Sequence, residues 1–324
     1  MTLVIEFLTL IVGIVIILMC AEFALRSSMR IAGHFRLSHG FVGMTILSIG
    51  TSFPEIFTHL AGSLRILGDP STMDEVSGLV LGTNIGSDIF QQNVMLAVVG
   101  LLAVIRVRRP SINRNVGALI LAGVLLLLAG LNGFISRLEG AVLFFGYIAY
   151  LFYLKRTDRP KQHEHDAMSR ASLSGQIFIT LLSFVLMGFA AERVLDASLR
   201  IIEGIHISAS LYGVIILGIA ACMPEAITSL AAVRKRQPDI AAGILIGSNV
   251  TNPMFAAGLG ALISGYTVPG VIIWYDLPVK IATALLIYYF LRNSKALTKP
   301  KALVLIGAYI VFIAVRKIFF PVDF

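Results

Sequence analysis

The stretches GTSFPEIFTHL (residues 50–60) and AACMPEAITSL (residues 220–230) each place a Pro-Glu pair deep inside an apolar run. A carboxylate at the depth of a lipid bilayer is costly unless it is partnered, so Glu55 and Glu225 are candidate functional residues. The alternative interpretation is a structural ion pair with Arg193 or Lys280. Two acids at equivalent places in two stretches favour a shared functional site.

The prolines of these stretches add oxygen ligands to the predicted site. Pro54 has no N–H group, so the carbonyl of Gly50 loses its helical partner, and Pro224 has the same effect on Ala220. Unpaired carbonyls are tolerated at membrane depth only where they line a cavity or are otherwise satisfied. A free carbonyl beside a carboxylate is typical of a site for a hard cation.

The chain as a whole has the composition of a membrane protein. Of its 324 residues, 57% are hydrophobic and only 14% are charged, far from the balance of a soluble domain. A spanning helix needs about 20 apolar residues. We therefore predict an all-α polytopic membrane protein with ten transmembrane helices, at 3–25, 39–64, 77–105, 115–133, 138–154, 173–197, 208–233, 240–265, 269–291 and 302–320.

A polar stretch at 155–172 divides these ten helices five and five. An odd number of helices per half inverts the second half relative to the first, as in many secondary transporters. We predict a first repeat at 1–154, a cytoplasmic linker at 155–172 and a second repeat at 173–324. An offset of 170, then of 161, aligns Glu22/Glu192, Arg30/Arg200, Pro54/Pro224, Glu55/Glu225, Thr58/Thr228, Gly82/Gly243, Gly86/Gly247 and Ser87/Ser248.

The net charge of +8 does not indicate a nucleic-acid partner, because the basic residues are distributed by side of the membrane. Loops after odd-numbered helices carry 19 Lys and Arg residues, against 5 on the opposite side, with Arg193 and Lys280 inside apolar runs. By the positive-inside rule the odd loops are cytoplasmic and both termini face outward. Within the runs, we expect ion pairs between Asp276 and Lys280, four residues apart, and between Glu22 and Arg26.

Helical spacing completes the predicted site. Residues three and four positions from each glutamate share its helix face; they are Thr51, Ser52, Thr58 and His59 around Glu55, and Ala221, Cys222, Thr228 and Ser229 around Glu225. A second motif follows in each half, LGTNIGSDIFQQN (81–93) and AGILIGSNVTNPMF (242–255), with glycines that permit close helix approach. Its polar residues could bring hydroxyl and amide oxygens against the glutamates; they are Ser87, Asp88 and Gln91, and Ser248, Asn249 and Asn252.

These paired motifs resemble those of the cation/calcium exchanger superfamily, specifically its sodium/calcium exchanger branch. The resemblance covers the whole ten-helix plan, and implies one calcium and several sodium sites served by sliding of helices 1 and 6. It makes Glu55 and Glu225 the calcium carboxylates. It also implies hydroxyl or carbonyl ligands from Thr51, Ser52, Ser87 and Ser248.

The chain departs from that branch at four positions. Ala221 and Cys222 replace a Thr-Ser pair, and Gln91 and Asn252 stand where the branch carries Asn and Asp. A third central carboxylate is thus missing, although Asp88 restores a charge three positions earlier. Amides at these positions are more similar to the proton/calcium branch.

The sequence therefore predicts an antiporter that exchanges Ca²⁺ against Na⁺, with exchange against H⁺, or of another divalent ion, as the alternative. An empty site would hold two like charges at low dielectric, so either monovalent cations or a proton must replace the divalent ion. A transport-dead sensor or assembly protein stays open as a second class. A membrane metalloenzyme using Glu55 and His59 is disfavoured, because no His-Glu-x-x-His motif accompanies them.

We expect no enzymatic activity and no cofactor beyond the transported Ca²⁺ and Na⁺ or H⁺. The expected partners are inorganic cations and the lipid bilayer of a prokaryotic inner or plasma membrane. A monomer is compatible with the sequence, which does not fix the oligomeric state.

Overall fold

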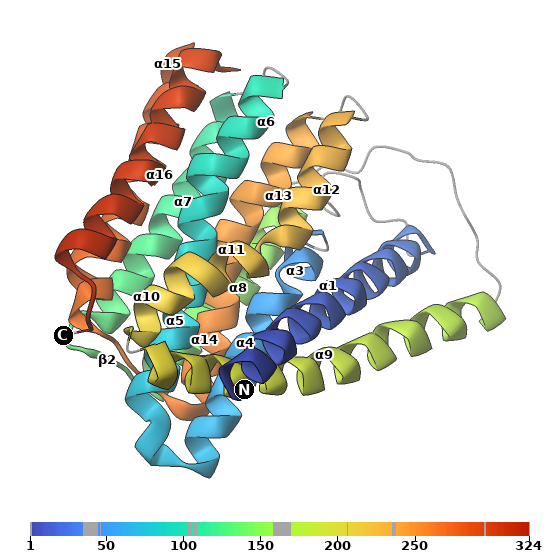
Figure 1. Cartoon of the computed structure of the whole chain (residues 1–324). Helices are drawn as coiled ribbons and strands as arrows, with labels where there is room; N and C mark the ends of the chain where they lie inside the picture. Colours follow the sequence, from blue (N-terminus) through green and yellow to red (C-terminus); the bar gives the residue numbers. More distant parts are fainter. Residues whose placement is uncertain are drawn as a thin grey trace.

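The computed structural model describes residues 2–34, 45, 47–102, 105–106, 109–157, 170–205, 207–234, 238–294 and 296–323, and these are helical almost throughout. The fold is an all-α polytopic membrane protein, as the sequence predicted (Figure 1). In the first half the helices are α1 (Thr2–His34), α3 (Ser48–Thr51), α4 (Phe53–Gly68), the 3-10 turn η2 (Pro70–Thr72), α5 (Met73–Phe90), the π-helical turn η3 (Gln91–Met95), α6 (Leu96–Leu102), α7 (Arg109–Gly130) and α8 (Arg137–Thr157).

The remaining helical elements follow in the second half of the chain. They are α9 (Arg170–Ile205), α10 (Ala209–Tyr212), the π-helical turn η4 (Gly213–Leu217), α11 (Gly218–Ala221), α12 (Met223–Arg234), α13 (Pro238–Thr251), the π-helical turn η5 (Asn252–Ala256), α14 (Ala257–Ser264), the π-helical turn η6 (Ile272–Asp276), α15 (Leu277–Ser294) and α16 (Lys299–Phe319).

Nine helical stretches within the described residues are long and apolar enough to cross a membrane. The tenth predicted span, 39–64, corresponds to α3 and α4, and its residues 39–44 and 46 lie outside the described part of the chain. The same holds for 158–169, most of the predicted linker. The observed helices extend several predicted spans, most of all α1 and α9, which reach past the apolar runs at one or both ends.

Two antiparallel ladders tie the halves together. Strand β1 (Ile105–Arg106) pairs with β4 (Ala296–Leu297), and β2 (Phe134–Ile135) pairs with β3 (Tyr266–Thr267). Each ladder joins a loop of one half to a loop of the other. The sequence did not predict them, because two residues are too few to show an alternating pattern.

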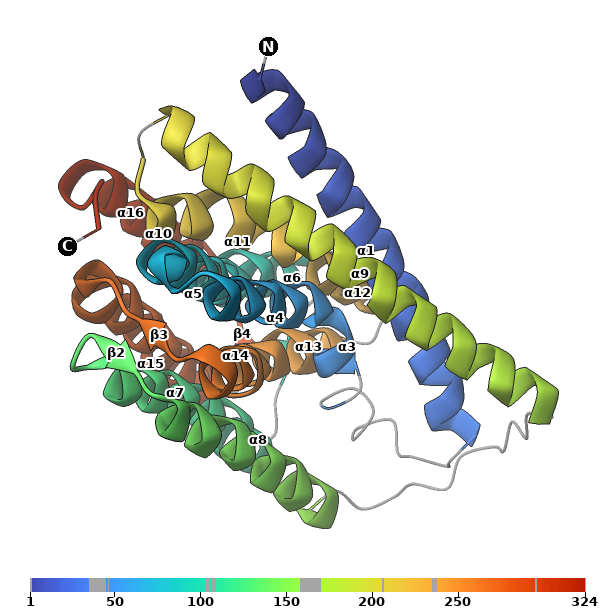
Figure 2. The same ribbon diagram turned by 90° about the horizontal axis from the view of Figure 1, so that it is seen from below.

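Helices α1 and α9 form a separate layer on one side of the molecule. They run side by side and cross the remaining helices obliquely, while α7 and α8 lie on the opposite side (Figures 1 and 2). Leu10 and Ile17 of α1 pack with Ala190 and Val194 of α9 in one apolar cluster. The other faces of both helices expose large apolar side chains, as a lipid-facing surface requires (Leu8 57%, Phe178 65%).

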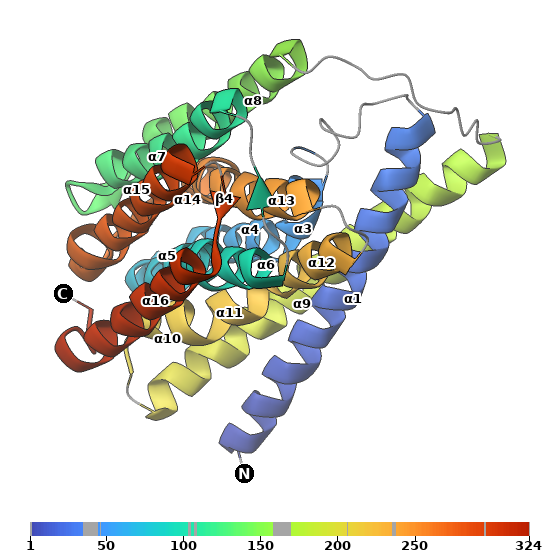
Figure 3. The ribbon, with the colours of Figure 1, turned by 90° about the horizontal axis from the view of Figure 1, so that it is seen from above.

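The interior is built around α4, α5, α13 and α14, which the views along the helix bundle place at its centre (Figure 3). Helix α5 lies backbone to backbone against the segment α10–η4–α11. A Cβ added to Gly82 would lie 2.5 Å from Ser210 O, and one added to Gly86 would lie 2.4 Å from Val214 O. The predicted close approach at these two glycines is confirmed, and it brings the second motif of the first half against the second half.

Candidate functional site

Both Pro-Glu motifs follow an interruption of their helix. The chain leaves helical geometry at Ser52 (φ −82°, ψ 11°) between α3 and α4, and at Cys222 (φ −79°, ψ 5°) between α11 and α12. Pro54 and Pro224 stand two residues further on, where each new helix begins. The break is present in both halves, and it places Glu55 and Glu225 in the first turn of α4 and α12.

The two glutamates are buried at the centre of the protein, Glu55 at 1% exposure and Glu225 at 0%. Ser87 Oγ of α5 donates to Glu55 Oε1 at 2.6 Å. Glu225 Oε1 accepts from Ser52 Oγ at 3.2 Å and from Ser248 Oγ of α13 at 3.3 Å. Thr51 Oγ1 also lies 3.5 Å from Ser248 Oγ, and Asn249 Nδ2 donates to Gln91 Oε1, so the structure brings both motifs of both halves into one site.

The two halves differ at the interruption itself. Ser52 Oγ reaches across to Glu225 of the other half, whereas Cys222 Sγ contacts Ile219 O of its own helix at 3.2 Å. Cys222 therefore makes no contact across to the other half of the kind that Ser52 makes. That a ligand group is lost at Cys222 stays a prediction.

Amide side chains extend the site along α5 and α13. Gln91 Nε2 donates to Ser87 Oγ at 2.9 Å, and Asn249 Nδ2 donates to Gln91 Oε1 at 3.3 Å. Asn252 Nδ2 donates to Asp88 Oδ1 at 2.8 Å. Gln91 and Asn252 each begin a π-helical turn, a feature that widens a helix and is frequent at functional sites.

The predicted pair between Asp276 and Lys280 is wrong. Lys280 Nζ instead donates to Asp88 Oδ2, and Asp276 Oδ1 lies 3.2 Å from Arg316 Nε. Asp276 ends the π-helical turn η6 and Lys280 lies in α15, and each side chain meets a buried partner of opposite charge on another helix, Arg316 of α16 and Asp88 of α5. The structure thus adds Lys280 to the neighbourhood of the site.

Several acceptor oxygens of this region receive no hydrogen bond. Among the described residues, the buried oxygens without a donor include Glu55 Oε2, Glu225 Oε2, Asn84 Oδ1, Asn249 Oδ1 and Asn252 Oδ1. A buried acceptor left without a partner costs about 1–3 kcal/mol. Five such oxygens around one site, all of them acceptors, form a lining that suits a cation.

The remaining predicted ligands lie at the edge of this lining. Thr51 Oγ1 is 3.5 Å from Ser248 Oγ, so these hydroxyls connect the first half to the second. Gly50 is buried, and its carbonyl as an ion ligand stays a prediction. Ala220 and Ala221 border a small cavity of about 30 Å³ beside Pro54, lined also by α1 and α9.

Two predicted hydroxyls face their own helices instead of the site. Thr58 Oγ1 donates to Pro54 O at 2.8 Å, and Thr228 Oγ1 donates to Pro224 O at 2.7 Å. Each satisfies a carbonyl in the first turn after the break, a common role of threonine in membrane helices.

His59 belongs to a separate network. Its Nδ1 is 3.2 Å from Tyr266 OH and its Nε2 is 3.0 Å from Asn84 Nδ2, so both ring nitrogens have partners away from Glu55. Within the described residues, no group of three or more His, Cys, Asp or Glu side chains could hold a metal ion. His59 and Glu55 therefore make their hydrogen bonds to different side chains.

Sequence reasoning missed Asn84, Tyr266 and the role of Lys280. Asn84 Nδ2 also donates to Asn252 O at 2.9 Å, which ties α5 to the π-helical turn η5. Asn84 lies in the quoted second motif, three residues before Ser87, and its helical spacing could have identified it. Lys280 and Tyr266 come from segments without a repeat signature, so only tertiary structure reveals them.

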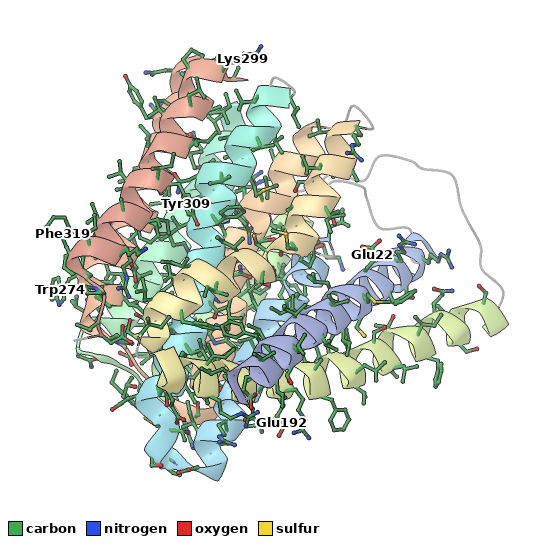
Figure 4. The ribbon with its side chains drawn as sticks, in the orientation of Figure 1. Glu22, Glu192, Trp274, Lys299, Tyr309 and Phe319 are labelled. Carbon is green, nitrogen blue, oxygen red and sulfur yellow. The ribbon has the colours of Figure 1, made fainter. Side chains whose placement is uncertain are left out.

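A larger groove lies between α4 and α9, away from the central carboxylates. It has a volume of about 730 Å³ and is lined mainly by apolar side chains, with Arg65, Asp69, Glu192 and Asp196 among them. Glu192 and Glu22, equivalent in sequence, lie toward opposite ends of the α1–α9 layer (Figure 4). Glu22 pairs with Arg26 at 2.5 Å, as predicted, and Arg65 pairs with Asp196 at 3.6 Å.

Comparison with known proteins gives a consistent result. The profile of the family described as "Sodium/calcium exchanger protein" matches residues 5–155 and 175–317. The inner membrane protein YrbG of Escherichia coli K12 is 29% identical over 94% of each chain. The sodium/calcium exchanger MaX1 of Methanosarcina acetivorans is 23% identical over 96% of this chain and 98% of its own. The putative antiporter CaxA of Alkalimonas amylolytica is 27% identical over 81% and 80%.

Among solved structures, the fold is similar to that of the sodium-calcium exchanger NCX_Mj soaked with 10 mM Na⁺ and zero Ca²⁺. The TM-score is 0.67 at 23% identity, covering 96% of this chain and 99% of that chain. Similarity at this level of identity shows that the helical fold is shared.

Proposed function

The chain belongs to the sodium/calcium exchanger family, and from that premise we propose that it exchanges Ca²⁺ for Na⁺ at the site formed by Glu55 and Glu225. The family is one of transporters of inorganic cations, and the fold is that of a membrane-spanning transporter. The observation that carries the finer proposal is the set of buried acceptor oxygens without donors, which includes one oxygen from each glutamate.

The chemistry of this lining favours calcium over the alternatives. Ca²⁺ takes six to eight oxygen ligands in flexible geometry, and the site offers carboxylate, hydroxyl and amide oxygens on four different helices. Mg²⁺ demands a tighter octahedron and gives up its water reluctantly, so a site assembled from several helices suits it less. Glu55, Glu225, Ser52, Ser87 and Ser248 are the proposed direct ligands, with Thr51, Gln91, Asn252 and the carbonyls of Gly50 and Ala220 at the margins.

Obligatory exchange follows from the burial of the carboxylates. Two glutamates at 0–1% exposure repel each other at low dielectric when no cation is bound. The loaded site is close to neutral, so it can change its exposure from one side of the membrane to the other at lower cost than the empty site. Each divalent ion must therefore be replaced by monovalent cations or protons before the protein returns.

Alternating access is proposed to use the α1–α9 layer. These two helices pack mainly on each other and cover the cavity beside Pro54, Ala220 and Ala221. Sliding of this layer against α4 and α12 would open that cavity to one side or the other. The ion pair Glu6–Arg200 joins α1 to α9 within the layer, whereas Arg65–Asp196 joins the layer to α4 at a half-exposed arginine and would have to change its partner during such a movement.

The proposal includes the placement of the chain in a prokaryotic inner or plasma membrane. The loops after odd-numbered helices, which carry 19 basic residues, are assigned to the cytoplasm, and both termini are assigned to the outside. The repeats are proposed to comprise 1–154 and 173–324, joined by a cytoplasmic linker at 155–172. A monomer is proposed to be sufficient for transport, because all ligands named come from one chain.

Exchange against protons is the second candidate, and specific residues favour it. Ala221 and Cys222 supply no hydroxyl to the site, and the carboxylate of a sodium site is replaced by the amide of Asn252. Fewer oxygen ligands lower the affinity for Na⁺ but leave the glutamates able to take up a proton. If neither gradient drives calcium uptake, the remaining interpretation is a sensor that binds ions without transporting them.

The test is uptake of radiolabelled calcium into proteoliposomes that contain the purified protein. An outward sodium gradient and an outward proton gradient are applied separately. Uptake driven by sodium supports sodium/calcium exchange, and uptake driven by protons alone identifies the second candidate. Calcium binding without uptake under either gradient would reject an exchanger and indicate a sensor.

A further inference from the structure

Lys280 and Asp88 form an ion pair in the interior of the protein. Lys280 lies on α15 and Asp88 on α5, with side-chain exposures of 1% and 0%. Burying a charged ammonium is expensive, and in this protein Asp88 is its ion-pair partner across the helix interface. A buried pair of this kind adds little to stability, so its position needs another explanation.

The pair is connected to the proposed ion site. Asp88 follows Ser87, the residue that donates to Glu55 at 2.6 Å, and Asp88 Oδ1 accepts from Asn252 Nδ2 at 2.8 Å. Asn252 in turn accepts from Asn84 Nδ2 of α5 through its backbone carbonyl, so Asp88 and Asn252 link α5 to the π-helical turn η5. Asp88 is therefore a third buried carboxylate next to the proposed site, and Lys280 holds a positive charge against it.

The second buried cation of the described residues lies elsewhere. Arg316, also fully buried, pairs with Asp276 and Asp323 and donates to Ser210, at the end of the protein where the C-terminal segment packs. Arg193 of α9 is exposed. Within the described part of the chain, Lys280 is thus the buried cation whose ion-pair partner, Asp88, adjoins a residue of the proposed site.

We infer that Lys280 is a tethered monovalent cation that occupies the position of one exchangeable ion and so fixes the stoichiometry at two monovalent ions per divalent ion. This rests on the proposed exchange function. Glu55, Glu225 and Asp88 carry three negative charges, and the ammonium reduces their sum to −2. One divalent ion neutralises that charge, and so do two sodium ions or two protons. The exchange is therefore electrically neutral with either counter-ion.

Removing the tethered charge should change both stoichiometry and voltage dependence. In Lys280→Met the three carboxylates require three monovalent ions, and each cycle moves one net charge. The double variant Asp88→Asn with Lys280→Met returns the sum to −2 and serves as the matched control. It also removes both members of the buried pair, which preserves folding better than removing one.

The experiment measures calcium accumulation at equilibrium in proteoliposomes with an outward tenfold gradient of the driving monovalent ion. At zero potential, two counter-ions give about 100-fold accumulation and three give about 1,000-fold. The wild type and the double variant should reach the lower value and should not respond to an imposed inside-positive potential. Lys280→Met should approach the higher value, and an inside-positive potential should raise its uptake further.

The outcomes separate this inference from the proposed function. Wild-type accumulation near 1,000-fold, or wild-type uptake that responds to potential, overturns the role of Lys280 and leaves exchange intact. Active Lys280→Met that stays voltage-insensitive also overturns it. If Lys280→Met does not fold, the wild-type stoichiometry decides alone. Absence of gradient-driven uptake by the wild type rejects exchange, and the inference with it.

Discussion

Ser87 Oγ donates to Glu55 Oε1 over 2.6 Å, whereas the equivalent serine of the other half, Ser248, donates to Glu225 Oε1 over 3.3 Å. Glu225 compensates with a second donor, Ser52, at 3.2 Å. The two halves therefore place serines at equivalent positions, but the hydrogen bonds from these serines to the glutamates differ. One glutamate depends on a single short contact and the other on two longer ones.

This asymmetry predicts unequal effects of removing the serines. Ser87→Ala should raise the calcium concentration for half-maximal uptake about tenfold, because a hydrogen bond to a charged group contributes about 1.5 kcal/mol or more. Ser248→Ala should raise it only about threefold, because Ser52 still donates to Glu225. Initial rates of uptake across calcium concentrations measure both values. A larger effect of Ser248→Ala would contradict the asymmetry.

Glu55→Gln and Glu225→Gln should each reduce calcium uptake on the order of 100-fold or more, because one remaining central carboxylate cannot neutralise a divalent ion. Glu22→Gln is the matched control. Glu22 also lies in a membrane helix, but it pairs with Arg26 and is distant from the site. Its variant should retain uptake close to the wild type. Full calcium uptake by Glu55→Gln or by Glu225→Gln would show that the substituted glutamate is not required for transport.

Bound calcium should also raise the melting temperature of the detergent-solubilised protein. A ligand at 100 times its dissociation constant stabilises the state that binds it by about 2.7 kcal/mol. Calcium should shift the melting temperature of the wild type but not of Glu55→Gln, and magnesium should produce a smaller shift. Equal shifts in the wild type and in Glu55→Gln would place calcium at another site.

The fold and the centre of the site were accessible from sequence because they depend on local signals. Apolar runs of spanning length predict helices, and the Pro-Glu pairs mark the interruptions that the structure has at Ser52 and Cys222. The internal repeat then indicates that Glu55 and Glu225 meet. Each of these inferences needs only the length of an apolar run, the spacing between similar residues, or a proline, which has no backbone N–H group.

The parts that sequence reasoning missed depend on which helix faces which. Lys280 has an acidic neighbour at the correct spacing on its own helix, yet it pairs with Asp88 across the interface with α5. A spacing rule can identify partners within one helix but cannot rank them against partners on another. Likewise, Thr58 and Thr228 share a helix face with the glutamates, but their hydroxyls donate to the backbone carbonyls of Pro54 and Pro224.

Cys222→Ser should increase the sodium sensitivity of exchange. In the present site Cys222 Sγ contacts Ile219 O, while Ser52 at the equivalent position donates across to Glu225. A hydroxyl at 222 would supply an oxygen facing Glu55. One additional oxygen ligand, contributing about 1 kcal/mol, should lower the sodium concentration for half-maximal calcium uptake about fivefold.

Cys20→Ser is the control for this change. Cys20 is a buried cysteine of α1 that packs in an apolar cluster with Phe53 and Ile56, where no described residue gives it a hydroxyl or carboxylate partner, so its variant should leave the sodium dependence unchanged. Sodium-dependent uptake in parallel for both variants gives the comparison. An unaltered sodium dependence in Cys222→Ser would show that the missing hydroxyl does not limit sodium binding.

The last prediction concerns the contact that aligns the two halves. Gly86 lies so close to η4 that a Cβ would stand 2.4 Å from Val214 O and 2.5 Å from Val214 Cα, both backbone atoms. Gly86→Ala should therefore force α5 away from η4 and destabilise the protein by about 2 kcal/mol, within the range for overpacking. Gly117→Ala, on α7 with no atom within 4 Å, should be neutral or slightly stabilising. Thermal unfolding in detergent measures the stability of both variants.

Because Ser87 follows Gly86 directly, the same displacement should lengthen the contact between Ser87 and Glu55. It should therefore weaken calcium uptake, even where Gly86→Ala stays folded. Stability and calcium affinity that both match those of Gly117→Ala would show that this backbone contact does not position the site.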